Sequence, residues 1–175
     1  MARRLTMSDM DEFFMASYSL EHTKRYSMKP VIHQESVATH SYFVALCVLL
    51  MHKDYEFNVN QAIKIALCHD LAEMEISDVN HLVKKQFPEV AEALKNAEEK
   101  IIAKFPTHLQ EYCVQYNGST PEALIVHYAD AFQCAQYANN EMKMGNRGYM
   151  VDVYANSLRR MEGMKEKLRP YTREK

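Results

Sequence analysis

The sequence has few of the residues that build tight turns, with Gly 4 and Pro 5 among 175 residues. Because strands and hairpins depend on such residues, their scarcity disfavours a β-rich fold. Ala, Leu, Met, Glu and Lys are abundant instead, which favours helices. A chain of this length can bury a substantial core in a single unit. We therefore predict an all-α protein, a single-domain helical bundle that spans residues 1–175.

The sequence also lacks an excess of positive charge and any long apolar run. Its formal net charge is -2, whereas proteins that bind nucleic acids need a positive field to neutralise phosphates. It contains no stretch of about 18 apolar residues and no apolar segment of the signal-peptide type near its start. We expect a cytoplasmic protein that forms no stable complex with nucleic acid and does not bind membranes.

Paired cysteines are a further absence. Cys47, Cys68, Cys113 and Cys134 stand apart, and no two of them form a C-x-x-C pair. Structural zinc sites usually take two ligands from one short turn, so this spacing disfavours a cysteine-based zinc site. Three of the four cysteines interrupt apolar helical runs. We therefore expect buried free thiols in a reducing compartment.

The most informative stretch is a helical run that changes from apolar to charged. Helical spacing places His69, Asp70 and Glu73 on one broad face, in continuation of the apolar stripe of residues 62–66. Burying a carboxylate without a partner costs on the order of several kcal/mol, so this face requires a compensating cation. We predict one continuous helix through these residues, which frays near Glu75, and a metal ion beside it.

Two further helical patterns each contain one polar residue that could bind a metal. The pattern of residues 37–53 is apolar nearly all round, which predicts a central helix, and its stripe is interrupted by His40. The pattern of residues 121–144 is interrupted by Asp130. Either residue alone would also fit a hydrogen-bonded position in the core. Together with the His-Asp pair they form a mixed nitrogen and oxygen site that suits a divalent metal.

In chain order, these residues form the pattern H…HD…D, which resembles the HD-domain metal-dependent phosphohydrolases. Within that superfamily the sequence is similar to the YfbR-type 5'-deoxynucleotidases and the phage DatZ-type dATP triphosphohydrolases. The resemblance implies a helical bundle of the HD-domain type. The stretches that carry it are Arg25-Tyr26, Glu35 to Ser41, His69 to Glu73 with Asp78, and Ala129 to Ala131.

The resemblance implies a role for each polar residue at the centre. His40, His69, Asp70 and Asp130 would hold one divalent transition metal, Co, Mn, Zn, Fe or Ni, with room for additional Mg at the phosphates of the substrate. Glu73 would orient or deprotonate a water that the metal activates. Arg25, which lies upstream of these ligands, would be the second catalytic residue beside Glu73.

The resemblance also implies a set of substrate-binding residues, to which Arg25 belongs. Arg25 has a planar fork that suits a phosphate, although without the family spacing it would be taken for an exposed loop arginine. Tyr26 stands where the family commonly has Trp, whose ring crowds the ribose 2' position and favours deoxyribose. Met28 lines the base pocket or only packs, and Lys84 meets a phosphate tail or lies in solvent. The predicted set is Arg25, Tyr26, Met28, Asp78, Asn80, His81 and Lys84.

These residues predict a hydrolase of deoxyribonucleoside 5'-phosphates, in which activated water attacks the phosphorus on the 5' oxygen and the deoxynucleoside leaves. A monophosphate would yield phosphate and a triphosphate would yield tripolyphosphate, so 5'-nucleotidase and dNTP triphosphohydrolase both stay open. The alternatives are an HD hydrolase of another nucleotide phosphoester and a non-catalytic helical interaction module stabilised by metal. Glu73 and Asp78 argue against the second. The relatives imply a homo-oligomer, a dimer or a hexamer.

Overall fold

Helices form nearly all the regular structure of the protein. The computed structural model describes residues 6–79 and 81–174, and no strand occurs among them, which confirms the all-α prediction. The first half of the chain contains α1 (Met7–Ser17), α2 (Ser19–His22), α3 (Val37–Met51), α4 (Val59–Cys68) and α5 (Glu73–Ile76). The second half contains α6 (His81–Gln86), α7 (Pro88–Ile102), α8 (Thr107–Gln115), α9 (Pro121–Lys143), α10 (Gly148–Leu168) and the short 3-10 helix η1 (Arg169–Tyr171).

Polar caps set the limits of the long helices. The Ser36 hydroxyl accepts a hydrogen bond from the Thr39 amide at 3.1 Å and begins α3. The Thr120 hydroxyl accepts one from the Ala123 amide at 3.2 Å and begins α9. These oxygens satisfy amides that have no partner within the helix. Gly145 follows the end of α9 with φ 106, a conformation that residues with a side chain rarely adopt.

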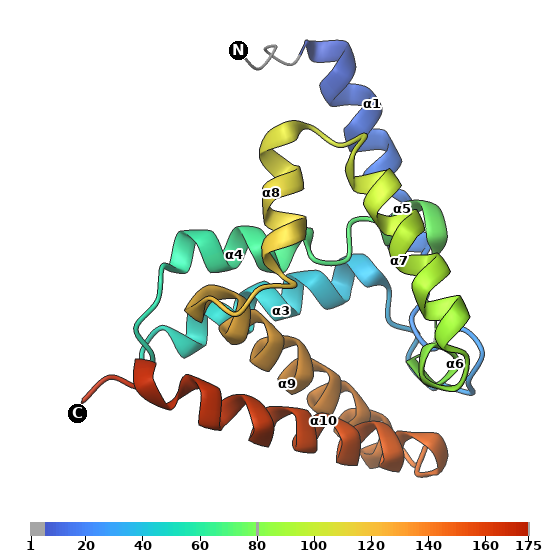
Figure 1. The fold of residues 1–175 in the computed structure, drawn as a ribbon. Coiled ribbons are helices and arrows are strands. Elements are labelled where there is room, and N and C mark those ends of the chain that lie inside the picture. Colours follow the sequence, from blue (N-terminus) through green and yellow to red (C-terminus); the bar gives the residue numbers. More distant parts are fainter. Residues whose placement is uncertain (1–5, 80, 175) are drawn as a thin grey trace.

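The core lies where α9 meets α3 and α4. Figure 1 shows α9 and α10 side by side as an antiparallel pair, with α3 and α4 packed against α9. Burial of the apolar side chains between these helices is the main contribution to the stability of the fold. The largest fully buried apolar members of this cluster are Val44, Val48, Ile65, Ile125, Val126 and Leu168.

A second, smaller cluster joins the end of α4 to α7 and α8. It is built from Cys68, Ala72, Ile101, Phe105 and Cys113, and the ring of Phe13 in α1 meets Phe105 edge to face at 5.3 Å. All four cysteines are free, as predicted, and three of them are buried, whereas Cys47 is half-buried. None of the helices in the described ranges combines the length and apolar character that a membrane span requires.

The prediction of one continuous helix through the His-Asp pair is wrong. Residues 69–72 form a turn between α4 and α5. The amides of Leu71 and Glu73 bond to carbonyls three residues back, at 3.2 and 3.0 Å, so the chain tightens there as in a 3-10 helix. His69 Nδ1 lies 2.7 Å from the Ala66 carbonyl oxygen and covers the end of α4. Side-chain periodicity did not reveal this turn, because His69 keeps helical φ and ψ.

One side of α3 is exposed, although its nearly all-round apolar pattern predicted a central helix. Its inner side packs on α4 and α9, with Val44 and Val48 at 0% exposure. Apolar periodicity marks a side chain as suited to burial but does not say whether a partner covers it. The apolar side chains on the exposed side are Tyr42, Phe43, Leu46, Leu49 and Leu50.

Candidate metal centre

The four predicted ligands converge where α3, α4 and α9 meet. His40 lies in α3, His69 follows the last residue of α4, and Asp130 lies in α9. One ligand atom from each of these three lies within 4.8 Å of the others, and His40 Nε2 is 3.3 Å from Asp130 Oδ1. Asp70 Oδ2 lies 3.1 Å from His69 Nε2 and 3.8 Å from His40 Nε2. The fold therefore gathers the whole predicted set.

Hydrogen bonds behind the two imidazoles determine which ring nitrogen faces the centre. His69 Nδ1 lies 2.7 Å from the carbonyl oxygen of Ala66, and His40 Nδ1 lies 2.6 Å from Oε1 of Gln133. Both oxygens can only accept, so each Nδ1 donates, and in the neutral ring each Nε2 carries the lone pair. His69 Nε2 is buried and has no hydrogen-bond partner. A buried lone pair beside carboxylates fits a metal ion.

Two donors hold the Asp130 carboxylate from behind. Arg160 Nη2 donates to Oδ2 at 2.6 Å and the Tyr116 hydroxyl donates to the same oxygen at 3.2 Å. Burial raises the pKa of Asp130, but its contact with His40 and the charge of Arg160 outweigh burial and hold that pKa well below its usual range. The carboxyl is therefore ionised at neutral pH, with Oδ1 on the side of His40, as a metal ligand must be.

The electrostatics of the centre favour a cation. Burial lowers the pKa of His69, but the charge of Asp70 outweighs it and raises that pKa to about 9. Burial likewise raises the pKa of Asp70, and the charge of His69 outweighs it and lowers that pKa to about 2. The carboxylates thus draw positive charge to Nε2 of His69, where a divalent metal would replace the proton. The nitrogen and oxygen donors suit the predicted transition metals.

Arg25 lies beside these ligands, which rules out the alternative of an exposed loop arginine. Its side chain is 13% exposed, and its Nη2 donates to the Cys134 thiol at 3.2 Å. Its Nε lies 3.5 Å from Glu35 Oε2 and has no hydrogen-bond partner. The charge of Arg25 also lowers the pKa of Asp70. A buried guanidinium with an unused N–H next to metal ligands can bind an anionic oxygen.

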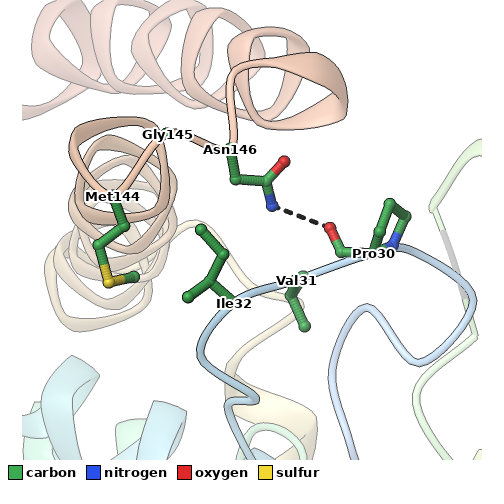
Figure 2. Close-up of a pocket in the computed structure, with 6 residues that line it drawn as sticks. All are labelled: Pro30, Val31, Ile32, Met144, Gly145 and Asn146. Atoms are coloured by element: carbon green, nitrogen blue, oxygen red, sulfur yellow. Dashed lines mark hydrogen bonds between the residues drawn. The ribbon is translucent and has the colours of Figure 1, made fainter.

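The loop that carries Arg25 is fastened to the end of α9. Figure 2 shows the Asn146 side chain, whose amide donates to the Pro30 carbonyl at 2.8 Å beside a pocket of about 400 Å³. The fully buried Glu141 carboxylate accepts hydrogen bonds from the backbone amides of residues 32–33 at 2.8 and 2.7 Å. These bonds fix the backbone of the loop and so restrict where the guanidinium can lie.

Glu73 faces charges of both signs at the edge of the centre. Burial raises its pKa, and the charges of Asp70 and Asp78 raise it further. The positive charges of Arg25 and Lys84 oppose this rise, and the pKa reaches about 9. Four predicted residues therefore lie within electrostatic reach of Glu73. With such a pKa, the Glu73 carboxyl holds a proton at neutral pH, and a cation at the centre would lower that pKa and favour the ionised form.

The remaining members of the predicted substrate set are placed less uniformly. The Tyr26 ring stacks on Tyr137, with centroids 5.2 Å apart and planes at 3°. Met28 is 84% exposed, so its side chain lies at the surface. Asn80 lies outside the described residues, as does the side chain of His81.

Several residues at the centre were missed by the sequence reasoning. Arg160 reaches Asp130 from α10, and an arginine in a polar helix gives no signal of this contact. Gln133 could have been found, because it lies one helical turn after Asp130 on the long apolar helix. Glu98 in α7 lies close enough to the charged edge for Lys84 to act on it; burial raises its pKa and Lys84 opposes the rise.

Comparisons with known proteins agree with this arrangement. The HD-domain profile matches residues 18–167. A conserved hypothetical protein from Pyrococcus furiosus shares 26% identity at a TM-score of 0.78, over 91% of this chain and 95% of that chain. An HD-domain phosphohydrolase from Listeria innocua shares 22% identity at a TM-score of 0.71, over 91% and 82%. No curated protein sequence matches the chain.

A third similar structure is the cyanophage S-2L HD phosphohydrolase DatZ, bound to dA and one catalytic Zn2+ ion. It shares 21% identity at a TM-score of 0.65, over 99% of this chain and 90% of that chain. At these identities, the Listeria and cyanophage structures show a common fold. The profile covers the greater part of the chain, including all four predicted ligands. By its sequence profile and its fold, this chain belongs to the HD-domain family.

Proposed function

We propose that this protein is a metal-dependent hydrolase of deoxyribonucleoside 5'-phosphates. The observation that carries the proposal is the buried guanidinium of Arg25, whose Nε has no hydrogen-bond partner and whose charge acts on Asp70. A phosphate-binding group next to a cation-binding centre is the pairing that phosphoester hydrolysis requires. DatZ, which has the same fold, was solved with dA and a catalytic Zn2+ ion, and this supports a deoxynucleotide substrate.

The predicted ligands His40, His69, Asp70 and Asp130 would hold one divalent ion. Such an ion, when bound, supplies a Lewis acid for a phosphoryl oxygen and lowers the pKa of water towards neutrality. The hydrogen bonds at both Nδ1 atoms keep the Nε2 lone pairs directed at the centre, so the imidazoles need not reorient to bind it.

Arg25 binds and orients the phosphate. Its guanidinium presents several N–H donors in one plane and can take two oxygens of the phosphoryl group at once. Because it is buried, its charge acts on the developing negative charge of the transition state with little screening by water. The loop anchor at Glu141 keeps it in this position.

Glu73 manages the proton of the attacking water. Burial and the neighbouring Asp70 and Asp78 raise the pKa of Glu73, and the charge of a divalent ion at the centre would lower it again towards the range of a general base. Lys84 and Arg25 favour the ionised form that must be present at the start. Asp78 is assigned to the positioning of the sugar or leaving group.

Tyr26 and Lys84 are assigned to the sugar and to the phosphate tail of the substrate. Tyr26 is held flat against Tyr137, which gives it a fixed ring face for the sugar. Lys84 is assigned to the phosphates beyond the first one. Whether the substrate is a monophosphate or a triphosphate depends on this end of the site.

The test is a substrate panel with the purified protein. Deoxy- and ribonucleoside monophosphates and triphosphates are incubated with Mn2+, Co2+ or Mg2+, and the release of nucleoside, phosphate and tripolyphosphate is measured. We expect deoxynucleoside release that requires metal and exceeds ribonucleoside release. Phosphate as co-product identifies a 5'-nucleotidase, and tripolyphosphate identifies a triphosphohydrolase.

Two results would contradict the proposal. Equal turnover of ribo- and deoxynucleotides would indicate a hydrolase of another nucleotide phosphoester. Stoichiometric metal binding without turnover of any member of the panel would indicate a metal-stabilised interaction module. A variant with Glu75→Gln serves as a control for the protein preparation, because Glu75 is exposed and pairs with Lys104 at the surface.

A further inference from the structure

A buried glutamine connects the metal ligand of α3 to a buried carboxylate. Gln133 Oε1 lies 2.6 Å from His40 Nδ1, and Gln133 Nε2 donates to Glu35 Oε1. The three residues are 6%, 1% and 4% exposed, in the order Gln133, His40 and Glu35. They come from α9, α3 and the loop before α3, so only the folded chain assembles this row of hydrogen bonds.

The row has a fixed direction. The Glu35 carboxylate is paired with Arg25 and accepts hydrogen bonds, so the NH2 group of Gln133 must face it. The amide oxygen of Gln133 then faces His40 and can only accept, so the proton of that imidazole lies on Nδ1. Nε2 of His40 is left with its lone pair towards Asp130.

Glu35 also touches the phosphate-binding side of the site. Its second oxygen, Oε2, is buried without a hydrogen-bond partner and lies 3.5 Å from Arg25 Nε, which also has none. One carboxylate thus faces the amide that orients His40 on one side and the guanidinium of Arg25 on the other. The spacing of 3.5 Å leaves the Arg25 N–H free to turn towards an anionic oxygen.

We infer that Gln133 and Glu35 are positioning residues of the metal centre. Gln133 fixes the imidazole of His40 as the Nδ1–H tautomer with Nε2 ready to bind a divalent metal, and Glu35 fixes the direction of the Gln133 amide while pairing with Arg25. The inference rests on the metal-dependent function proposed above. His69 obtains the same tautomer from the backbone carbonyl of Ala66, so His40 is the ligand whose orientation depends on side chains.

Exchanging the two groups gives the sharpest test. Gln133→Glu places a second carboxylate against Glu35, and Glu35→Gln lets the two amides pair in either direction. The double variant, Glu35→Gln with Gln133→Glu, again pairs one donor with one acceptor, now with the amide at position 35 as the donor, while the carboxylate at position 133 still accepts from His40 Nδ1. Gln133→Leu removes the row, and Gln136→Leu is the matched control, because Gln136 is an exposed residue of the same helix.

The first readout is the affinity for Co2+ in the absence of substrate, with folding checked by circular dichroism. Losing an outer partner of a metal-binding histidine weakens metal binding roughly 10- to 100-fold. We expect that loss in Gln133→Leu and Gln133→Glu, recovery of most of it in the double variant, and no change in Gln136→Leu. The affinity is independent of turnover, so it separates this inference from the assignment of the substrate.

The second readout is the state of the ring itself. Long-range 1H–15N NMR spectra of the metal-free protein should show His40 protonated at Nδ1 in the wild type and a mixture of tautomers in Gln133→Leu. In the double variant, metal affinity should recover while KM for the substrate stays raised, because Arg25 has lost its carboxylate partner. Unchanged Co2+ affinity in a folded Gln133→Leu, or a double variant as weak as Gln133→Glu, would overturn the inference.

Discussion

The two halves of the site are built in different ways. The ligand half is made of side chains on or next to long helices. Both imidazoles and the Asp130 carboxylate are held from behind, Asp130 by Arg160 and Tyr116. The substrate half is made of Arg25 on a loop and Glu73 on a helix of four residues. The positions of its residues depend on the charges around Glu73 and on the hydrogen bonds that fasten the loop of Arg25 to Glu141.

The difference indicates a division of work. Helices with capped ends and buried faces hold a metal site to the accuracy that coordination requires. Loops and short helices can adjust to a substrate, and they open at a lower free-energy cost than the core. Variants in the ligand half should therefore remove the metal, whereas variants in the substrate half should leave the metal bound and change turnover or stability.

The largest effect is expected from Asp130→Asn. The substitution keeps the size of the side chain but removes the charge that the metal needs, and it presents an amide to Arg160 or to the centre. Metal affinity should fall by at least about 100-fold, more than an outer residue costs, and hydrolysis should fall to background. The loss of metal binding is measured by the metal content after gel filtration and by titration with Co2+. The exposed Asp152→Asn in α10 is the control, and retained metal in Asp130→Asn would remove Asp130 from the ligand set.

Glu73→Gln should have the next largest effect and should leave the metal in place. An amide can orient water but cannot take its proton, so kcat should fall by about 10²- to 10⁴-fold while Co2+ affinity stays within error of the wild type. Steady-state kinetics and metal titration on the same preparation measure both. If turnover is undiminished, Glu73 is not the proton acceptor. If the metal is lost instead, the division between the two halves is wrong.

The ligand half could largely be predicted from the sequence, for a physical reason. His40 and Asp130 each interrupt an apolar stripe of a long helix, and such a stripe is buried, so a single polar residue in it must be compensated. The caps Ser36 and Thr120 fixed the starts of these helices. Periodicity could also have revealed Gln133, which lies one turn beyond Asp130.

The substrate half could not be predicted in this way. In the turn at residues 69–72, His69 and Ala72 keep helical dihedral angles while the hydrogen bonds change, so no periodic pattern marks the end of α4. One contact of the ligand half escaped prediction as well, because Arg160 meets Asp130 only where α10 packs on α9, and one exposed helix arginine looks like another in sequence. Arg25 was placed by its resemblance to family spacing, since an arginine in a loop carries no burial signal of its own.

The smallest effect concerns the anchor of the substrate loop, and it depends on pH. Burial raises the pKa of Glu141, but hydrogen bonds from the Ile32 amide, Asn146 and the His33 amide outweigh it and lower that pKa below the ordinary value of 4.5. A carboxyl with a depressed folded-state pKa stabilises the fold fully above its unfolded value. That contribution is lost as the pH falls through the folded pKa.

Glu141→Gln should therefore lower the free energy of unfolding by about 2 kcal/mol at neutral pH, because its NH2 group faces amide donors that need an acceptor. Urea unfolding near pH 7 and again below 4.5, the ordinary glutamate value, measures the gap to the wild type, which should narrow in acid. Glu92→Gln, at an exposed position in α7, is the control and should be as stable as the wild type at both pH values.

The Co2+ affinity of Glu141→Gln should stay unchanged, because the anchor holds the loop of Arg25 and contacts no ligand. A loss of metal together with stability would mean that the two halves of the site form one cooperative unit.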